Sequence, residues 1–147
     1  MEIYIGADHN GFELRNELIL YLQRSGYTVH DDGNDTRDPQ DDYPVFAKRV
    51  VNDMLATGDP EVRGILICGS GQGIMIAANR HKGIRACLGY DIDSVKAARN
   101  DDDCNVLALP AKVLQDGQTE VIVEAFLNTP FENTERYVRR IQEMDEQ

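Results

Sequence analysis

The 147-residue sequence lacks tryptophan, contains only three cysteines and has no long apolar run. Because no stretch approaches the roughly 18 apolar residues of a transmembrane helix, a membrane span is excluded. The opening residues, MEIYIGADHNG, have neither the charged-then-apolar order of a signal peptide nor the amphipathic pattern of a transit peptide. We therefore expect a cytoplasmic protein. Residues 1–147 are expected to form one domain, since this length suits one hydrophobic core and is short for two.

Basic residues are scarce in this chain. Fifteen lysines and arginines face 26 aspartates and glutamates, which gives a net charge of −11. Nucleic acid is therefore not an expected partner, because its phosphates need a basic surface. The same imbalance draws attention to any site for an anion, since local positive charge must there overcome a repulsive background.

The three cysteines are Cys68, Cys87 and Cys104, which lie far apart in the sequence and form no cluster with the three histidines. This spacing argues against both a disulfide framework and a zinc site, and no metal site is expected. Each cysteine must then be interpreted singly. A buried, packing role is the default for a free cysteine, and we assign Cys87 and Cys104 to it.

Short apolar segments alternate with segments of helical periodicity along the whole chain. The predicted strands are 2–7, 27–31, 64–68, 84–89 and 106–109, and the predicted helices are 11–25, 44–58, 73–80, 92–99, 117–127 and 133–144. Repeated strand–helix units imply a parallel sheet with helices on both faces. Ligands of such sheets bind at the carboxyl ends of the strands, so the residues that follow each strand are the candidates for chemistry.

The clearest candidate is the loop Cys68–Gly73, with the sequence CGSGQG, between the third strand and its helix. Its three alternating glycines let backbone N–H groups turn inward and bind an anion at a helix N-terminus. A tight turn alone would explain one or two of these glycines. Dinucleotide binding is a minor alternative, because the spacing is G-x-G-x-G, Ile74 follows it, and the loop is not the first of the chain.

Cys68 and Ser70 supply the reactive groups of this loop. A thiol at a helix N-terminus, among amide donors, ionises more readily and can act as a base or a nucleophile. The Ser70 hydroxyl, two residues on, can both donate and accept a proton. The loop therefore predicts an anion site beside a reactive thiol.

Two other groups of residues have open interpretations. Asp8 and His9 follow the first strand, where they can cap the next helix or contact a ligand. Arg136 and Arg140 are i, i+4 neighbours on the last predicted helix, so their guanidinium groups share one face and suit a phosphate. A solvated face balanced by nearby glutamates is the alternative for this pair.

Six motifs together carry a resemblance that covers nearly the whole chain. They are GADHNGFELR at 6–15, DYP at 42–44, GILICGSGQGIMIAAN at 64–79, GIRA at 83–86, NVLAL at 105–109 and RYVRRI at 136–141. At these motifs the chain resembles the family of ribose-5-phosphate isomerase B and the galactose-6-phosphate isomerase subunits. The resemblance implies aldose–ketose isomerisation of a small phosphorylated sugar through an enediolate, without metal or organic cofactor.

The resemblance also implies an architecture and an assembly. The family fold is a three-layer α/β/α sandwich around a Rossmann-like, five-stranded parallel sheet. It implies a homodimer, alone or paired into a dimer of dimers, whose sites lie between subunits and whose C-terminal helix reaches the partner.

The resemblance also implies catalytic and binding roles for the matching residues of this sequence. Cys68 would be the base that moves a proton between C1 and C2, and Ser70 would assist proton transfer at the oxygens. The enediolate charge would be stabilised by backbone amides of the loop, those of Gly69, Gly71, Gln72 and Gly73. The sugar or its phosphate would be contacted by Asp8, His9 and Tyr43, and phosphate by Arg136 and Arg140 of the partner. One family branch uses a glutamate just after the loop, and Ile74 places this chain with the cysteine type.

The chain departs from the family before the fifth strand. Asp101 and Asp102 stand where ribose-5-phosphate isomerases of this family carry His-Asn, whose histidine is thought to open the furanose ring. Lys112 stands where some members have arginine. We keep Asp101 as a candidate acid or base and Asp102 and Lys112 as substrate contacts, with ribose 5-phosphate as the favoured substrate. Tetrose, allose or galactose 6-phosphate, a non-catalytic sugar-phosphate-binding module and a cysteine hydrolase are the alternatives.

Overall fold

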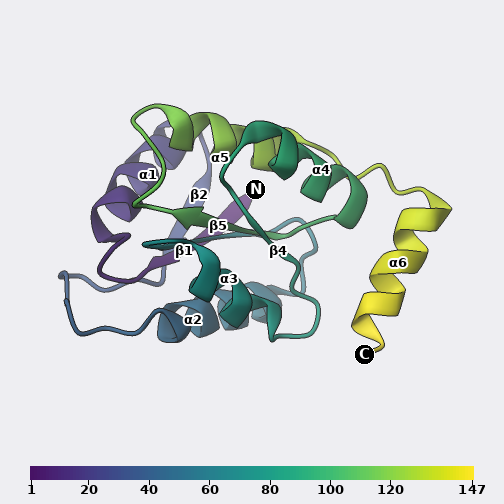
Figure 1. The fold of residues 1–147 in the computed structure, drawn as a ribbon, viewed down its shortest axis with the longest axis horizontal. Coiled ribbons are helices and arrows are strands. Elements are labelled where there is room, and N and C mark those ends of the chain that lie inside the picture. Colours follow the sequence, from purple (N-terminus) through teal and green to yellow (C-terminus); the bar gives the residue numbers. More distant parts are fainter.

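The computed structural model describes residues 1–147, in which a parallel sheet lies between two layers of helices (Figure 1). The strands are β1 (Glu2–Ala7), β2 (Thr28–Asp31), β3 (Arg63–Cys68), β4 (Ala86–Leu88) and β5 (Val106–Pro110), in the order β2-β1-β3-β5-β4. The helices are α1 (Phe12–Arg24), α2 (Tyr43–Thr57), α3 (Gln72–Asn79), α4 (Ile92–Asp102), α5 (Gln118–Asn128) and α6 (Glu135–Asp145). This confirms the predicted three-layer α/β/α architecture.

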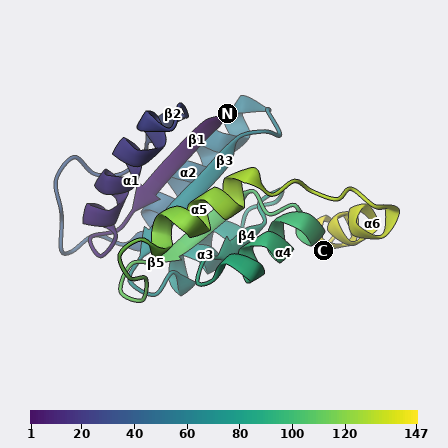
Figure 2. The ribbon, with the colours of Figure 1, turned by 90° about the horizontal axis from the view of Figure 1, so that it is seen from above.

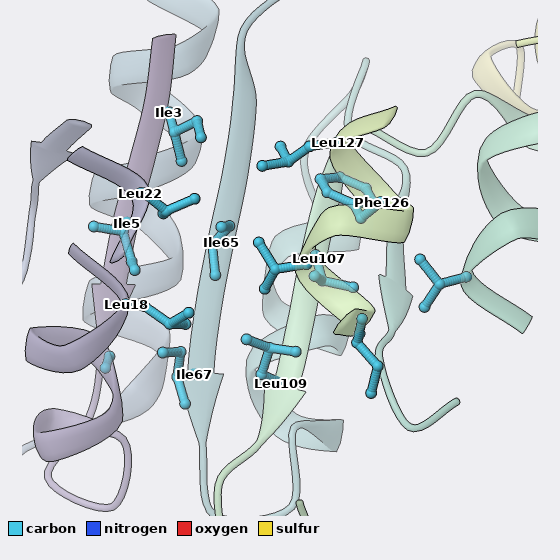
Figure 3. Packing of buried hydrophobic residues seen from close by; sticks show 14 of the residues in the cluster. Ile3, Ile5, Leu18, Leu22, Ile65, Ile67, Leu107, Leu109, Phe126 and Leu127 are labelled. Atoms are coloured by element: carbon cyan, nitrogen blue, oxygen red, sulfur yellow. The ribbon is translucent and has the colours of Figure 1, made fainter. Parts of the chain in front are cut away.

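The sheet separates two hydrophobic cores, because successive side chains of a strand point to opposite faces. Ile65 and Ile67 of β3 face α1, α4 and α5, where they pack with residues such as Leu18 and Phe126 (Figure 3). Leu66 and Cys68 point to the other face, which α2 and α3 cover. The alternation therefore places the Cys68 thiol on the side of the sheet from which α3 begins.

Two element boundaries differ from the sequence prediction. The edge strand β4 is confined to Ala86–Leu88, because the residue before it is held elsewhere: the Arg85 N–H donates to Asn105 Oδ1 at 2.9 Å. Helix α4 continues past Arg99 to Asp102. Its last turn is closed by Arg99 Nη1, which donates to Asp103 Oδ1 at 2.8 Å and to the Cys104 carbonyl oxygen.

Helix α6 differs from the other five helices because none of its residues is buried. It packs mainly on α4 and projects from the rest of the chain (Figures 1 and 2). An isolated eleven-residue helix is marginal in water, so α6 depends on further packing. None of the six helices combines the length and apolar character needed to cross a lipid bilayer.

Candidate functional site

The turn between β3 and α3 is shaped by Gly71, whose backbone is left-handed with φ of 72° at the N-cap of α3. A Cβ atom there would lie 2.6 Å from Leu88 Cδ1 and 3.1 Å from the Pro110 nitrogen, so only glycine fits. A Cβ on Gly73 would lie 2.6 Å from Cζ of Tyr43. The ring of Tyr43 therefore lies against the loop, as expected for a residue of the site.

The Cys68 thiol is held inside this turn. Cys68 ends β3, is 5% exposed, and its Sγ accepts a hydrogen bond from the Gly71 N–H at 3.1 Å. Ser70 is exposed, and its Oγ accepts the Gln72 N–H at 3.3 Å. The first N–H groups of α3 have no partners within the helix, so the thiol and the hydroxyl lie beside donors that can bind an anion.

The other two cysteines lie in the opposite core, as assigned from the sequence. Cys104 is buried, Cys87 packs against the same cluster, and all three cysteines are free thiols. A hydrogen bond with Cys87, together with burial, raises the pKa of the Cys104 thiol far above its usual range. Cys104 is therefore a packing residue and not a nucleophile.

Asp8 follows β1 and is held next to the loop. Its N–H donates to the Ile67 carbonyl at 3.1 Å, one residue before Cys68, and its Oδ1 accepts the N–H groups of Asn10 and Gly11 at 2.9 and 3.3 Å. The carboxyl is only 5% exposed, and burial raises its pKa although these two hydrogen bonds act to lower it. Asp8 therefore both shapes the β1–α1 turn and lies at the floor of the site.

His9 is oriented by Asp41, a residue that sequence reasoning did not single out. Oδ1 of Asp41 accepts the His9 backbone N–H at 2.9 Å and lies 2.8 Å from Nδ1. A proton on Nδ1 leaves Nε2 as the atom available to a ligand. Asp41 lies in a loop with several aspartates, and the sequence offers no signal that distinguishes it from the others.

Lys112 brings a positive charge to the same edge of the sheet. Its N–H donates to the Gly69 carbonyl at 3.0 Å, and a Cβ on Gly69 would lie 3.3 Å from Lys112 Cδ and 3.3 Å from Asn10 Nδ2. The exposed lysine therefore runs alongside the loop. Asn10 is a second neighbour that the sequence analysis did not name as a site residue.

Four of the predicted site residues lie at the opposite edge. Asp101 and Asp102 are in the last turn of α4, near the start of β5, whereas Cys68 lies at the end of β3 in the same parallel sheet. Arg136 and Arg140 are exposed on α6 (Figure 2). Within one chain these residues do not meet the loop.

Two of these residues, Asp101 and Arg140, both lie near Tyr137 of α6. Asn100 Nδ2 donates to Asp101 Oδ1 at 2.8 Å, and the negative charge of Asp101 raises the pKa of Tyr137 on α6. The geometry thus forms two partial sites. One has the thiol and the amides, and the other has the arginines and a hydrogen-bonded carboxylate.

A sequence profile of the Ribose/Galactose Isomerase family matches residues 3–144. The chain belongs to this family. The ribose-5-phosphate isomerase B of Mycolicibacterium paratuberculosis is 35% identical over 141 residues, which cover 96% of this chain and 87% of that protein. The probable ribose-5-phosphate isomerase B of Mycoplasma pneumoniae is 40% identical over 139 residues, covering 95% and 90%.

Solved structures of family members agree with the fold. A ribose 5-phosphate isomerase from Thermotoga maritima superposes with a TM-score of 0.92 at 40% identity, covering 99% of this chain and 98% of that one. Ribose-5-phosphate isomerase B from Mycoplasma genitalium, solved with bound ribulose 5-phosphate, gives 0.93 at 36% identity, covering 99% and 94%. The resemblance inferred from the six motifs is therefore confirmed.

In this member of the family, Asp8, His9 and Asp41 offer three ligand atoms within 4.8 Å of one another. These atoms are already paired, because Nδ1 of His9 lies 2.8 Å from Asp41 Oδ1 and Asp8 Oδ1 accepts two backbone N–H groups. The cluster is therefore best described as a hydrogen-bonded support for the imidazole. Chemically, the edge offers a thiol, a hydroxyl and amide donors, which suit proton transfer next to an oxyanion.

Proposed function

We propose that this protein is a sugar-phosphate isomerase that interconverts an aldose phosphate and a ketose phosphate, with ribose 5-phosphate and ribulose 5-phosphate as the favoured pair. One observation carries the proposal: the Cys68 thiol is held 3.1 Å from an amide of a glycine loop at the start of α3. The family membership and the names of the relatives support the same reaction.

Cys68 is the base in this proposal. Its thiolate removes the proton from C2 of the open-chain aldose, the electron pair forms the C1–C2 double bond, and negative charge develops on the C1 oxygen. The thiol then returns the proton to C1. Ser70 relays the proton between the two oxygens, and the amides of residues 69–73 stabilise the enediolate. The isomerisation is redox-neutral and needs no cofactor.

The phosphate is bound by residues of both partial sites. His9 and Lys112 stand beside the loop, and Asp8 and Tyr43 complete its floor and wall. Arg136 and Arg140 reach the same ligand from a second copy of the chain, so the assembly is a homodimer with sites between subunits. The absence of buried residues on α6 supports this assembly, because the helix has surface left to pack.

Asp101 is the group that acts on the sugar ring. As a hydrogen-bond acceptor of Asn100 Nδ2, its carboxylate is suited to take a proton from the anomeric hydroxyl. An ionised carboxylate carries no proton to give to the ring oxygen, whereas an imidazolium does, so an aspartate helps less there than a histidine. This observation favours, as a second substrate class, an open-chain tetrose phosphate, ahead of allose or galactose 6-phosphate.

A coupled assay over tetrose, pentose and hexose phosphates tests the proposal, and we expect the highest kcat/KM with ribose 5-phosphate. Thermal stabilisation by several of these sugars, with product from none, would instead identify a non-catalytic binding module. A cysteine hydrolase would need a histidine that activates the thiol. The only candidate is His9, but no hydrogen bond joins its ring to the Cys68 thiol, whose Sγ accepts the Gly71 N–H instead, and we expect no ester or amide cleavage.

A further inference from the structure

A cavity of about 590 Å³ opens at the amino edge of the sheet, away from the Cys68 loop. It is bounded by Met1, the first residue of β3, the end of α4 and the segment that follows α5. This volume lies within the range of small-molecule sites, about 300–1,000 Å³. None of the residues assigned to the isomerase site lines it.

Arg63 is the first residue of β3 and is only 6% exposed. Its Nη1 donates to the carbonyls of Pro60 and Val62 at 2.9 and 3.0 Å, but its buried Nε has no hydrogen-bond partner, and Arg63 forms no ion pair. Burial, together with the charge of Arg99, lowers the pKa of Arg63. A buried guanidinium without a counterion is costly. The Nε edge of Arg63 therefore has a partner to gain.

Arg99 is a second buried cation in the wall of this cavity and is 3% exposed. Its Nε donates to the Thr129 carbonyl at 3.2 Å, and its Nη1 donates to Asp103 Oδ1 and to the Cys104 carbonyl. Its Nη2 makes no hydrogen bond within the chain. Two buried arginines therefore bring unused donors to one cavity.

The charges around this cavity do not balance. Asp103 is the one carboxylate that pairs with the local arginines: its Oδ1 lies 2.8 Å from Arg99 and its Oδ2 lies 3.2 Å from Arg85. Both oxygens are thereby used, and the exposed Glu61, the other carboxylate in the cavity wall, forms no ion pair with Arg63. An excess of buried positive charge stands out in a chain whose net charge is −11.

We infer that this cavity is a second anion site, which binds a small phosphate- or carboxylate-bearing molecule through Arg63 and Arg99. Nε and Nη2 form the edge of a guanidinium that grips an oxyanion with two parallel hydrogen bonds, and this edge is the unused one in Arg63. Arg99 Nη2 adds a third donor. The site is independent of the isomerase proposal because the two share no residue.

Thermal unfolding of the full chain with inorganic phosphate, at constant ionic strength, tests the inference. The background variant is Arg136→Gln/Arg140→Gln, which removes the arginines proposed for the isomerase site. In it we expect 20 mM phosphate to raise Tm by about 2–4 °C. Arg63→Met should abolish this shift. Arg24→Gln, an equal charge change at an exposed position of α1, should leave it intact.

A parallel titration with malonate distinguishes a phosphate ligand from a carboxylate ligand, since the anion with the larger Arg63-dependent shift identifies the class. If Arg63→Met does not fold, Arg63→Lys is measured, which keeps the charge but loses the two-donor edge, and less than half the shift should remain. An unchanged shift in the Arg63 variant, or no shift with either anion in the background variant, would overturn the inference.

Two further readouts separate this site from the isomerase site. The Nε–H resonance of Arg63 should move on addition of phosphate, because this proton gains its first acceptor. Isomerase activity of Arg63→Met alone should stay within about twofold of wild type, since Arg63 contacts none of the proposed catalytic groups. If the Arg63 Nε–H resonance does not move on addition of phosphate, while Arg63→Met keeps normal isomerase activity, the anion site is contradicted and the isomerase proposal is unaffected.

Discussion

The two edges of the sheet differ in the charged groups that they bury. At the carboxyl edge, burial raises the pKa of Asp8 and raises that of Asp32 to about 6. At the amino edge, burial lowers the pKa of Arg63, and most of the arginines proposed to bind anions lie there. The thiol thus lies at an edge whose one buried arginine, Arg15, faces Asp31 at 3.4 Å, and the arginines proposed to bind anions lie at the edge that has no reactive thiol.

Neither edge alone therefore has all the groups that the proposed isomerisation of a phosphorylated sugar needs. The Cys68 loop offers amides and a thiol, and beside it lie Lys112, His9 and Arg37, whose Nε donates to the His9 carbonyl at 3.2 Å. The end of α4 and α6 offer Asp101, Arg136 and Arg140, but neither a thiol nor a glycine loop of amide donors. The predictions below test whether the two edges work as halves of one site.

The largest effect is expected from Cys68→Ala. Loss of the base should lower kcat by about 10³-fold or more, while the fold and ligand-induced stabilisation remain. Steady-state kinetics and circular dichroism measure the two properties. Cys87→Ala is the matched control and should retain activity, since Cys87 belongs to the opposite core. Turnover of Cys68→Ala at the wild-type rate would contradict the role of the thiol as base.

Mixing two impaired variants tests whether the site is shared between chains. Arg136→Gln/Arg140→Gln should raise KM by about 10²-fold, because two charge-assisted contacts to the phosphate are lost. After unfolding and refolding together with Cys68→Ala, half of the dimers contain one intact site, so about a quarter of the wild-type activity should return. Recovery no greater than the sum of the separate variants would place the site within one chain.

Asp41→Ala tests how the imidazole is held at the carboxyl edge. Without the carboxylate, His9 loses both of its hydrogen bonds to Asp41, and KM should rise about tenfold while kcat changes by less than about threefold. The nitrogen resonances of the ring should report mixed tautomers. Asp41→Asn keeps an acceptor and should restore most of the affinity, and Asp35→Ala in the same loop should be neutral. A fall in kcat alone would contradict the positioning role.

The smallest effect concerns stability. Burial and the neighbouring carboxylate of Asp53 raise the pKa of Asp32 from 3.8 to about 6, so between these values the folded state holds a proton that the unfolded state has lost. The free energy of unfolding should therefore fall as pH rises from about 4 to about 6.

Asp32→Asn should remove this penalty and stabilise the protein by about 1 kcal/mol at pH 7.5, a value reduced for partial exposure, with no gain at pH 4. Urea unfolding at both pH values measures the difference. The exposed Asp116→Asn should show no gain at either pH. Equal stabilisation by Asp32→Asn at the two pH values would show that ionisation is not the cause.

Much of the fold could be predicted because apolar periodicity and glycine placement are local signals. The segment GILIC and the glycines after it set both β3 and the start of α3, and the structure agrees within a residue or two. The end of α4 could not be predicted, because it depends on Arg99 reaching Asp103 and the Cys104 carbonyl. Such a contact has no signature in helical periodicity.

The site was predicted in part for the same reason. Cys68, Ser70, Asp8 and His9 follow strands, and strand ends meet at one edge of a parallel sheet. Asp41 was missed because long-range loop contacts bring it to His9, 32 residues away in sequence. The unpaired state of Arg63 also depends on which carboxylates its neighbours use, and this appears only in three dimensions.

Helix α6 has one more consequence if it completes the site of a neighbouring chain. The specific activity of the enzyme then depends on protein concentration. Below the dissociation constant of the dimer, a chain keeps its thiol but loses the partner's arginines that bind the phosphate. A lesion in α6 is likewise felt by the neighbour and not by the chain that carries it. Where an altered and a normal gene copy are expressed together, each mixed dimer would keep one of its two sites working.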